Sequence, residues 1–123
     1  MTENECRVLI VDDEESVRDL LKMMLSAESG FLVVGEAEDG VEALSVALQH
    51  RPDFVILDYA MPRMNGEESA RVLRGILSDV TIIAFSAYVT EQPEWADAHL
   101  TKDQFGEMVP LMKKLAGART GGS

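Results

Sequence analysis

Apolar residues gather in five short runs along the chain, and each run has the length of a β-strand. The runs are almost continuously apolar and do not alternate with polar residues, which indicates strands that are buried on both faces of a sheet. The predicted strands span residues 8–11, 32–34, 54–57, 80–85 and about 98–100.

The segments between these runs carry apolar residues at the spacing of one helical face, so helices are predicted between the strands and after the last one. Glu14 and Glu15 favour the start of a first helix, which ends at Ser29-Gly30. The sequence at 39–42 resembles a capping box for a second helix, and a third starts near Gly66. The predicted inward faces are Val17, Leu20, Leu21, Met24 and Leu25; Val41, Leu44, Ala47 and Leu48; Ala70, Leu73, Ile76 and Leu77; and Phe105, Met108, Val109, Met112 and Leu115.

The alternation of strands and helices predicts an α/β fold with a parallel sheet that is covered by helices. Only about a dozen residues separate the fourth and fifth strands, which is the minimum for a parallel crossover, and Pro93 lies among them. A fourth helix is therefore expected to be short or missing, with Tyr88 and Trp95 covering the crossover. Pro110 lies inside the last predicted helix, where we expect a kink or a break.

The chain of 123 residues is long enough for one domain with a core. We assign residues 1–116 to that domain and residues 117–123 to a flexible tail or the start of a linker. The single cysteine, Cys6, excludes an internal disulfide and is expected to be a small buried hydrophobic residue.

The net charge of −11 argues against direct nucleic-acid binding by this domain and suits a divalent cation or a basic partner surface. No apolar run reaches the length of a membrane span, and the N-terminus lacks the pattern of a signal peptide. We therefore expect a cytoplasmic protein that does not contact a membrane.

Polar side chains stand at the ends of four of the predicted strands, or just beyond them: Asp12 and Asp13, Asp58, Ser86, and Lys102. Because the carboxyl ends of parallel strands meet at one edge of a sheet, these groups are expected to lie together. Carboxylates in one place repel unless a cation lies among them, and oxygen ligands with room for water suit Mg²⁺ or Mn²⁺. A lysine and a hydroxyl can contact phosphoryl oxygens. The set meets the needs of aspartyl-phosphate formation, in which a carboxylate is the nucleophile.

Each of these residues also has a purely structural explanation. An aspartate at 12 or 13 could cap a helix, and Asp58 could be a turn residue. Ser86 alone would be ordinary loop chemistry, and Lys102 alone would be a solvated surface residue. We favour the functional interpretation because the residues follow separate strands that end at one edge.

Taken together, these residues resemble the receiver domain of bacterial response regulators, the phosphoacceptor part of two-component signal transduction. The resemblance covers residues 8 to about 115 and rests on the order and spacing of five segments. They are VLIVDD at 8–13, DG at 39–40, ILDYAMPRMNG at 56–66, FSA at 85–87 and LTK at 100–102.

The resemblance implies a flavodoxin-like fold, a doubly wound sheet of five parallel strands in the order 2-1-3-4-5. It implies that Asp58 is the phosphoacceptor and that Lys102 and Ser86 contact the phosphoryl group. The implied magnesium ligands are Asp13, Asp58 and the backbone carbonyl of Ala60, with Asp12 acting through water.

The resemblance also implies partners. Family members accept phosphate from a histidine kinase or a phosphotransfer protein, and they usually release it slowly by their own hydrolysis. Phosphorylation then switches the surface around the fourth and fifth strands, which controls a partner protein or an attached output domain.

Three features depart from the family's pattern. His99 stands where the family has a tyrosine or phenylalanine that rotates on phosphorylation, and Asp103 replaces the proline after the lysine. A cis bond before a non-proline residue costs about 2.5–4 kcal/mol, so we expect a trans bond between Lys102 and Asp103 and an altered lysine loop. The shortened crossover removes surface that many members use to dimerise or signal.

Two other functions fit part of the pattern. A binding module that signals without phosphate would accommodate the three departures. A hydrolase with an aspartyl nucleophile would use the same chemistry, but that chemistry commonly needs a second carboxylate two residues after the nucleophile, where Ala60 stands. The phosphoacceptor hypothesis remains the best match to the residues.

Overall fold

Five parallel strands form one sheet in the order β2-β1-β3-β4-β5, the order that the family resemblance implied. The structure is a computed structural model that describes residues 5–87 and 91–121. The strands are β1 (Cys6–Val11), β2 (Phe31–Ala37), β3 (Phe54–Leu57), β4 (Thr81–Phe85) and β5 (Ala98–Leu100). The helices are α1 (Glu15–Ser26), α2 (Gly40–His50), α3 (Gly66–Ile76), the 3₁₀ helix η1 (Lys102–Glu107) and α4 (Met108–Gly121).

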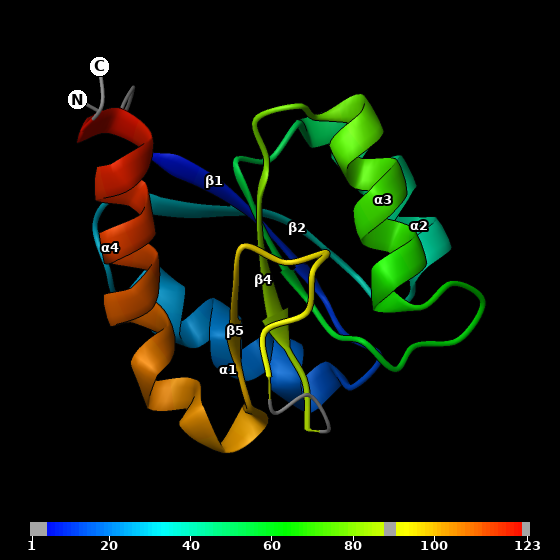
Figure 1. The fold of residues 1–123 in the computed structure, drawn as a ribbon. Coiled ribbons are helices and arrows are strands. Elements are labelled where there is room, and N and C mark those ends of the chain that lie inside the picture. Colours follow the sequence, from blue (N-terminus) through cyan, green and yellow to red (C-terminus); the bar gives the residue numbers. More distant parts are fainter. Residues whose placement is uncertain (1–4, 88–90, 122–123) are drawn as a thin grey trace.

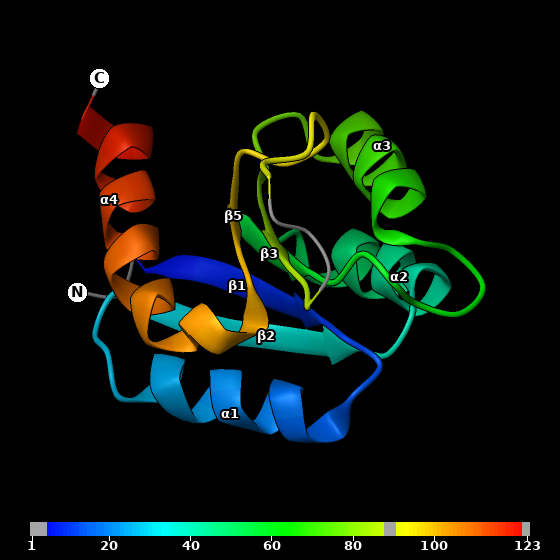
Figure 2. The ribbon, with the colours of Figure 1, turned by 60° about the horizontal axis from the view of Figure 1, so that its bottom comes forward.

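Helices cover both faces of the sheet, α1 and α4 on one face and α2 and α3 on the other (Figures 1 and 2). Val8 and Ile10 of β1 pack on the side of α1 and α4, whereas Leu9 and Val11 pack on the side of α2 and α3. Both sets of side chains are therefore buried, which explains why the strand sequences are continuous apolar runs. No helix in the described part of the chain has the length and apolar character of a membrane span.

The buried face of α2 differs in part from the predicted one. Val41 and Leu48, which the sequence assigned to the inward face, are 45% and 57% exposed. Ala47 is buried as predicted, and Leu44 packs against the core, but the other fully buried residues of this helix are Gly40 and Ala43. Because the fully buried residues are small, α2 can lie close to its neighbours, and Val41 and Leu48 then lie on its exposed side.

The last helix begins later than predicted, because η1 precedes it. A capping box between Thr101 and Gln104 closes the start of η1, and Phe105 in this segment is 43% exposed although it was predicted to face inward. The α-helix then starts at Met108, so Pro110 lies in its first turn. The break therefore falls before Pro110 and not at it, since a first-turn residue needs no intrahelical N–H bond.

The C-terminal segment is helical through Gly121, where the sequence predicted a flexible tail from residue 117. Arg119 anchors this end of α4 to the starts of β3 and β4. Its guanidinium lies 5.6 Å from the centre of the Phe54 ring. Its Nη1 atom donates to Asp53 O (3.3 Å), Asp79 O (2.5 Å) and Thr81 Oγ1 (2.9 Å).

The crossover between β4 and β5 contains no helix in its described residues, 86–87 and 91–97, in agreement with the sequence prediction. Trp95 packs against the core on the side of α2 and α3, as expected for a residue that covers the crossover. Tyr88, which was expected to do the same, lies outside the described residues.

Asp97 fixes the end of this crossover. Its N–H donates to Ile82 O at 2.8 Å, and its carboxylate accepts from Ile82 N at 2.8 Å and from Arg74 Nη2 at 3.1 Å. Arg74 also donates to the backbone oxygen of Trp95 at 2.9 Å. These bonds tie the end of the crossover to β4 and α3.

We expect Gly40→Ala to destabilise the fold by roughly 2–3 kcal/mol. A Cβ atom at this position would lie 2.6 Å from the backbone oxygen of Met64, and it would also overlap the hydroxyl of Ser69. Gly75→Ala is the matched control, because nothing lies within 4 Å of its added Cβ and alanine is the better helix former. Urea unfolding should show a lower midpoint for Gly40→Ala and an unchanged or higher one for Gly75→Ala. Equal midpoints for the two variants would contradict the close packing of α2.

Candidate acidic site at the carboxyl edge of the sheet

The predicted site residues lie at one edge of the sheet because the strands that precede them are parallel. Asp12 and Asp13 follow β1, Asp58 follows β3, Ser86 follows β4, and Lys102 comes two residues after β5. Val11 lies opposite Leu57 in the register of β1 and β3, and the N–H of Asp58 continues the ladder by donating to Val11 O at 3.0 Å. The strand register therefore fixes the backbone beneath the two acidic positions.

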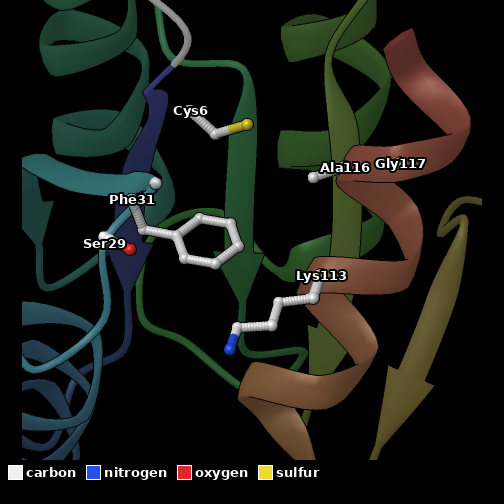
Figure 3. Close-up of a pocket in the computed structure, with 7 residues that line it drawn as sticks. Cys6, Ser29, Phe31, Lys113, Ala116 and Gly117 are labelled. Carbon is white, nitrogen blue, oxygen red and sulfur yellow. The ribbon is translucent and has the colours of Figure 1, made fainter. Parts of the chain in front are cut away.

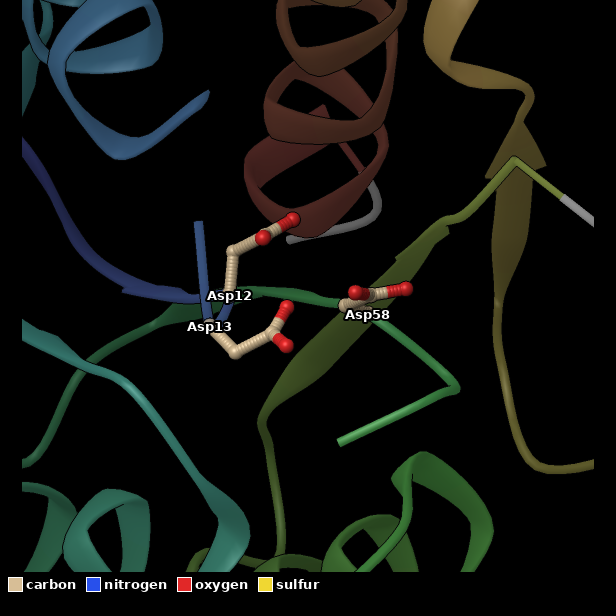
Figure 4. Close-up of side chains that lie close together, drawn as sticks. All are labelled: Asp12, Asp13 and Asp58. Carbon is tan, nitrogen blue, oxygen red and sulfur yellow. The ribbon is translucent and has the colours of Figure 1, made fainter. Parts of the chain in front are cut away.

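Three carboxylates converge at this edge (Figure 4). Asp12, Asp13 and Asp58 each offer an oxygen, and these oxygens all lie within 4.8 Å of one another. Asp12 is 2% exposed and Asp58 is 5% exposed, whereas Asp13 is exposed to solvent. Like charges in a buried place repel, so this arrangement needs a positive charge nearby.

Burial raises the pKa of both buried carboxyl groups above their ordinary values. For Asp58, the negative charge of Asp12 raises the pKa further, and Lys102 and a hydrogen bond from Ser86 oppose the rise. For Asp12, the opposing contacts are Lys102 and the backbone N–H of Glu14. The ionised form of each carboxylate is thus held at a cost in free energy.

Lys102 supplies the nearest positive charge. Its Nζ lies 2.7 Å from Asp12 Oδ2, 3.2 Å from Glu14 Oε1 and 3.4 Å from Asp58 Oδ2. Burial alone would lower the pKa of Lys102, but the hydrogen bond to Asp12 and the charges of Asp58 and Asp12 raise it above its ordinary value. The lysine is therefore fully protonated at neutral pH.

Ser86 and Ala60 complete the set. Ser86 is fully buried, and its hydroxyl is hydrogen-bonded to Asp58. Ala60 lines a small pocket together with Asp13, Asp58 and Lys102. The structure therefore brings all the residues singled out in the sequence to one place.

This donor set fits a hard divalent cation. Three carboxylates with one ammonium leave a net negative charge, and all the offered ligand atoms are oxygens, which Mg²⁺ and Mn²⁺ prefer. The open mouth of the pocket leaves room for water or substrate oxygens. With a carboxylate, a fixed cation and a hydroxyl on one side, the site is equipped for nucleophilic attack on a phosphoryl group.

The loop after Asp58 is held firmly by the two neighbouring helix starts. Gly66 N donates to Tyr59 O at 2.9 Å, and a Cβ on Gly66 would lie 2.7 Å from Asp58 O, so only glycine allows this approach. Arg63 adopts a left-handed backbone (φ 68°) and binds the carboxylate of Asp39, the N-cap of α2, at 2.5 Å. The loop that carries Asp58 is thereby fixed to both α2 and α3.

Sequence reasoning missed two contacts of the site. Glu14 was interpreted only as a favourable charge at the start of α1, yet it pairs with Lys102. Tyr59 stacks on Trp95 with ring centres 6.2 Å apart and an interplanar angle of 21°. Both contacts join residues far apart in sequence, and the only available signal was their adjacency to Asp13 and Asp58.

The peptide bond after Lys102 has the predicted geometry. The described residues contain no cis peptide bond, so the bond between Lys102 and Asp103 is trans as predicted. The loop continues directly into η1, which begins at Lys102. His99 lies in β5, half-buried, at the position that was singled out in the sequence.

A second pocket lies at the opposite edge of the sheet, between the start of β2 and the later turns of α4 (Figure 3). Cys6 and Phe31 line it, and Lys113 at its rim is paired with Glu28 at 2.8 Å. Cys6 is half-buried against the core, and burial raises the pKa of its thiol. This agrees with a mainly structural cysteine, because a raised pKa disfavours the reactive thiolate.

Comparison with known proteins points to one family. The family model of the response regulator receiver domain matches residues 8–103. A protein-glutamate methylesterase/protein-glutamine glutaminase from Pyrococcus abyssi is 40% identical over 94 residues, which are 76% of this chain and 25% of that protein. This chain spans about a quarter of the length of the methylesterases that it matches.

Solved structures agree with the sequence matches. The signal receiver domain of NarL from Mycobacterium tuberculosis has a TM-score of 0.81 and 31% identity, over 92% of this chain and 97% of that one. A chain of the CheX–CheY–BeF₃–Mg²⁺ complex from Borrelia burgdorferi has a TM-score of 0.78 and 28% identity, over 89% of each chain.

Asp58→Asn is expected to raise the melting temperature by roughly 2–5 °C at neutral pH without divalent cations. Because its pKa is raised, Asp58 makes a contribution to stability that is fully present only below the unfolded-state pKa of about 3.9. The wild type loses this contribution as the pH rises through the folded-state pKa of Asp58. The asparagine variant has no carboxyl group to ionise at this position and keeps its stability. Calorimetry from below the unfolded-state pKa to neutral pH measures the difference in melting temperature. Asp79→Asn is the control, because Asp79 is exposed to solvent. A lower melting temperature for Asp58→Asn than for the wild type would contradict the assigned repulsion.

Proposed function

Because the chain belongs to the response regulator receiver domain family, we propose that it is the phosphoacceptor of a two-component system and takes a phosphoryl group on Asp58. The observation that carries this proposal is the placement of Asp58 at the sheet edge, bonded to the Ser86 hydroxyl and within 3.4 Å of Lys102 Nζ. A buried carboxylate with a raised pKa is a better nucleophile than a hydrated one, and both neighbours can contact the arriving group.

The proposed transfer makes one bond and breaks one bond. An oxygen of Asp58 attacks the phosphorus, and the bond from phosphorus to the donor atom breaks, with its electron pair leaving on the donor. The donor atom is the imidazole nitrogen of a phosphohistidine or the carboxylate oxygen of an acyl phosphate. Lys102 and Ser86 contact phosphoryl oxygens and offset the charge that they carry in the transition state.

Mg²⁺, with Mn²⁺ as a substitute, is the proposed cofactor. The proposed ligands are Asp13, Asp58 and the backbone carbonyl of Ala60, with Asp12 acting through water. When bound, the ion would neutralise phosphoryl charge and offset the repulsion among the carboxylates. Support comes from the three converging acids and from the relative that was solved with BeF₃ and Mg²⁺.

The proposed partners follow from the family and from the relatives. A histidine kinase or a phosphotransfer protein would supply the phosphoryl group, and an output domain or a separate effector would receive the signal in the cytoplasm. The Pyrococcus methylesterase illustrates the arrangement, because the region similar to this chain makes up only 25% of that protein.

The proposed output surface is the crossover between β4 and β5. Ser86, at its start, is bonded to Asp58, and Trp95, near its end, stacks on Tyr59. Two consecutive residues of the acceptor loop thus touch both ends of the crossover, which gives phosphorylation a route to this surface although His99 replaces the family's aromatic residue.

We expect the protein to gain the mass of one phosphoryl group when it is incubated with acetyl phosphate and Mg²⁺. Intact-protein mass spectrometry measures the gain, and EDTA should abolish it because charge on the phosphoryl oxygens is then uncompensated. Asp58→Asn should gain nothing, and the remote Asp79→Asn should match the wild type. Equal labelling of Asp58→Asn and wild type would refute Asp58 as acceptor, and no labelling of the wild type would favour a binding module that works without phosphate.

Trp95 is the only tryptophan, so its fluorescence should report on the acceptor site. Addition of beryllofluoride with Mg²⁺ is expected to change its emission, because Tyr59 follows the occupied Asp58 and stacks on the indole. Tyr59→Leu should take up the ligand with a much smaller emission change, and Asp58→Asn should show none. Unchanged emission in a wild-type protein that has bound the ligand would contradict the route through the stack.

A further inference from the structure

The ammonium group of Lys102 is already shared among three carboxylates. An ammonium has three N–H donors, and Asp12, Glu14 and Asp58 all lie within 3.4 Å of Nζ. A phosphoryl group on Asp58 would bring additional oxygens that compete for these donors. One of the existing contacts must then lengthen or break.

The three contacts differ in how easily they break. The carboxylate of Asp12 is nearest, at 2.7 Å, and its side chain is only 2% exposed. Asp58 is 6% exposed and carries the phosphoryl group in the proposed reaction. The side chain of Glu14 is 60% exposed, so water can replace the lysine there at little cost in free energy, as is typical of exposed ion pairs.

Glu14 is also separate from the acids proposed to hold the metal. The converging group of oxygens consists of Asp12, Asp13 and Asp58, without Glu14. Glu14 stands at the N-cap of α1, but its side chain makes no capping hydrogen bond there. The carboxylate of Glu14 therefore does not cap the helix, and it contacts Lys102 instead.

We propose that Glu14 is a positioning residue that competes with the phosphoryl group for Lys102. This inference rests on the proposed function of Asp58 and deepens it. In the free protein Glu14 holds one N–H of Lys102. When the acceptor is occupied, that N–H passes to a phosphoryl oxygen, and Glu14 is released to solvent. Breaking the Glu14–Lys102 pair costs free energy, so the site binds a phosphoryl group more weakly than it would without Glu14.

Calorimetric titration with beryllofluoride at saturating Mg²⁺ tests this competition on the full chain. Glu14→Gln is expected to bind the probe roughly two- to fivefold more tightly than wild type, which lies within the range expected for loss of an exposed ion pair. Glu15→Gln is the matched control, because it makes the same charge change one residue further along and Glu15 is not a partner of Lys102. Its affinity should equal that of the wild type.

Two further measurements separate a contact from a general charge effect. Glu14→Asp keeps the charge but shortens the side chain by one methylene, so its affinity should fall between those of wild type and Glu14→Gln. Added salt should shrink the difference between wild type and Glu14→Gln, because exposed pairs are screened. Melting curves check that the variants are folded.

The possible results separate the role of Glu14 from the proposed phosphoacceptor function of Asp58. Equal or weaker binding by Glu14→Gln, or the same tightening in Glu15→Gln, overturns the role of Glu14 while leaving the phosphoacceptor proposal intact. If wild type itself binds no beryllofluoride, the proposed function fails, and the competition fails with it.

Discussion

Repulsion among carboxylates at one sheet edge is the constraint on which the site depends. Parallel pairing of β1 with β3 forces Asp12 and Asp58 to the same edge, and both are nearly inaccessible to solvent. Lys102, delivered by β5, is the counter-charge that makes this tolerable. The fold thus keeps a costly arrangement of charge in its ground state, as is common where a site must bind a cation or an anion.

Much of the remaining structure keeps this edge rigid. Arg63 ties the acceptor loop to the N-cap of α2, and Gly66 allows the start of α3 to rest against it. Asp97 and Arg74 hold the crossover against β4 and α3 where a helix would otherwise cover the sheet. Since these bonds surround Asp58 from several elements, the charged groups cannot relax their repulsion by moving apart.

The sequence predicted the features that arise from local patterns. Continuous apolar runs identified the strands. The polar residues that follow them were predicted to lie together, because the carboxyl ends of parallel strands meet at one edge of the sheet. The length of the crossover and Pro93 predicted a short or missing fourth helix, and the described residues of the crossover contain none. Features that depend on size and approach were not predictable in this way. The outward rotation of Val41 and Leu48 results from small residues packing closely, and periodicity alone does not measure how closely two helices approach.

Contacts between distant residues were also beyond the sequence. The stack of Tyr59 on Trp95 and the pair of Glu14 with Lys102 join different elements, and neither residue type is unusual at its position. The helical extension to Gly121 depends on Arg119 reaching the starts of β3 and β4, although the glycines nearby favour a loop. Such features require the assembled fold.

The short crossover between β4 and β5 has a consequence for how the chain can change length. Residues 86–97 are about as few as a parallel connection can use, and both ends are fastened, so a deletion there would pull Ser86 or Trp95 from its partner. An insertion would add slack at the surface and leave the sheet intact. Natural or engineered variation at this segment should therefore run in one direction, towards longer connections.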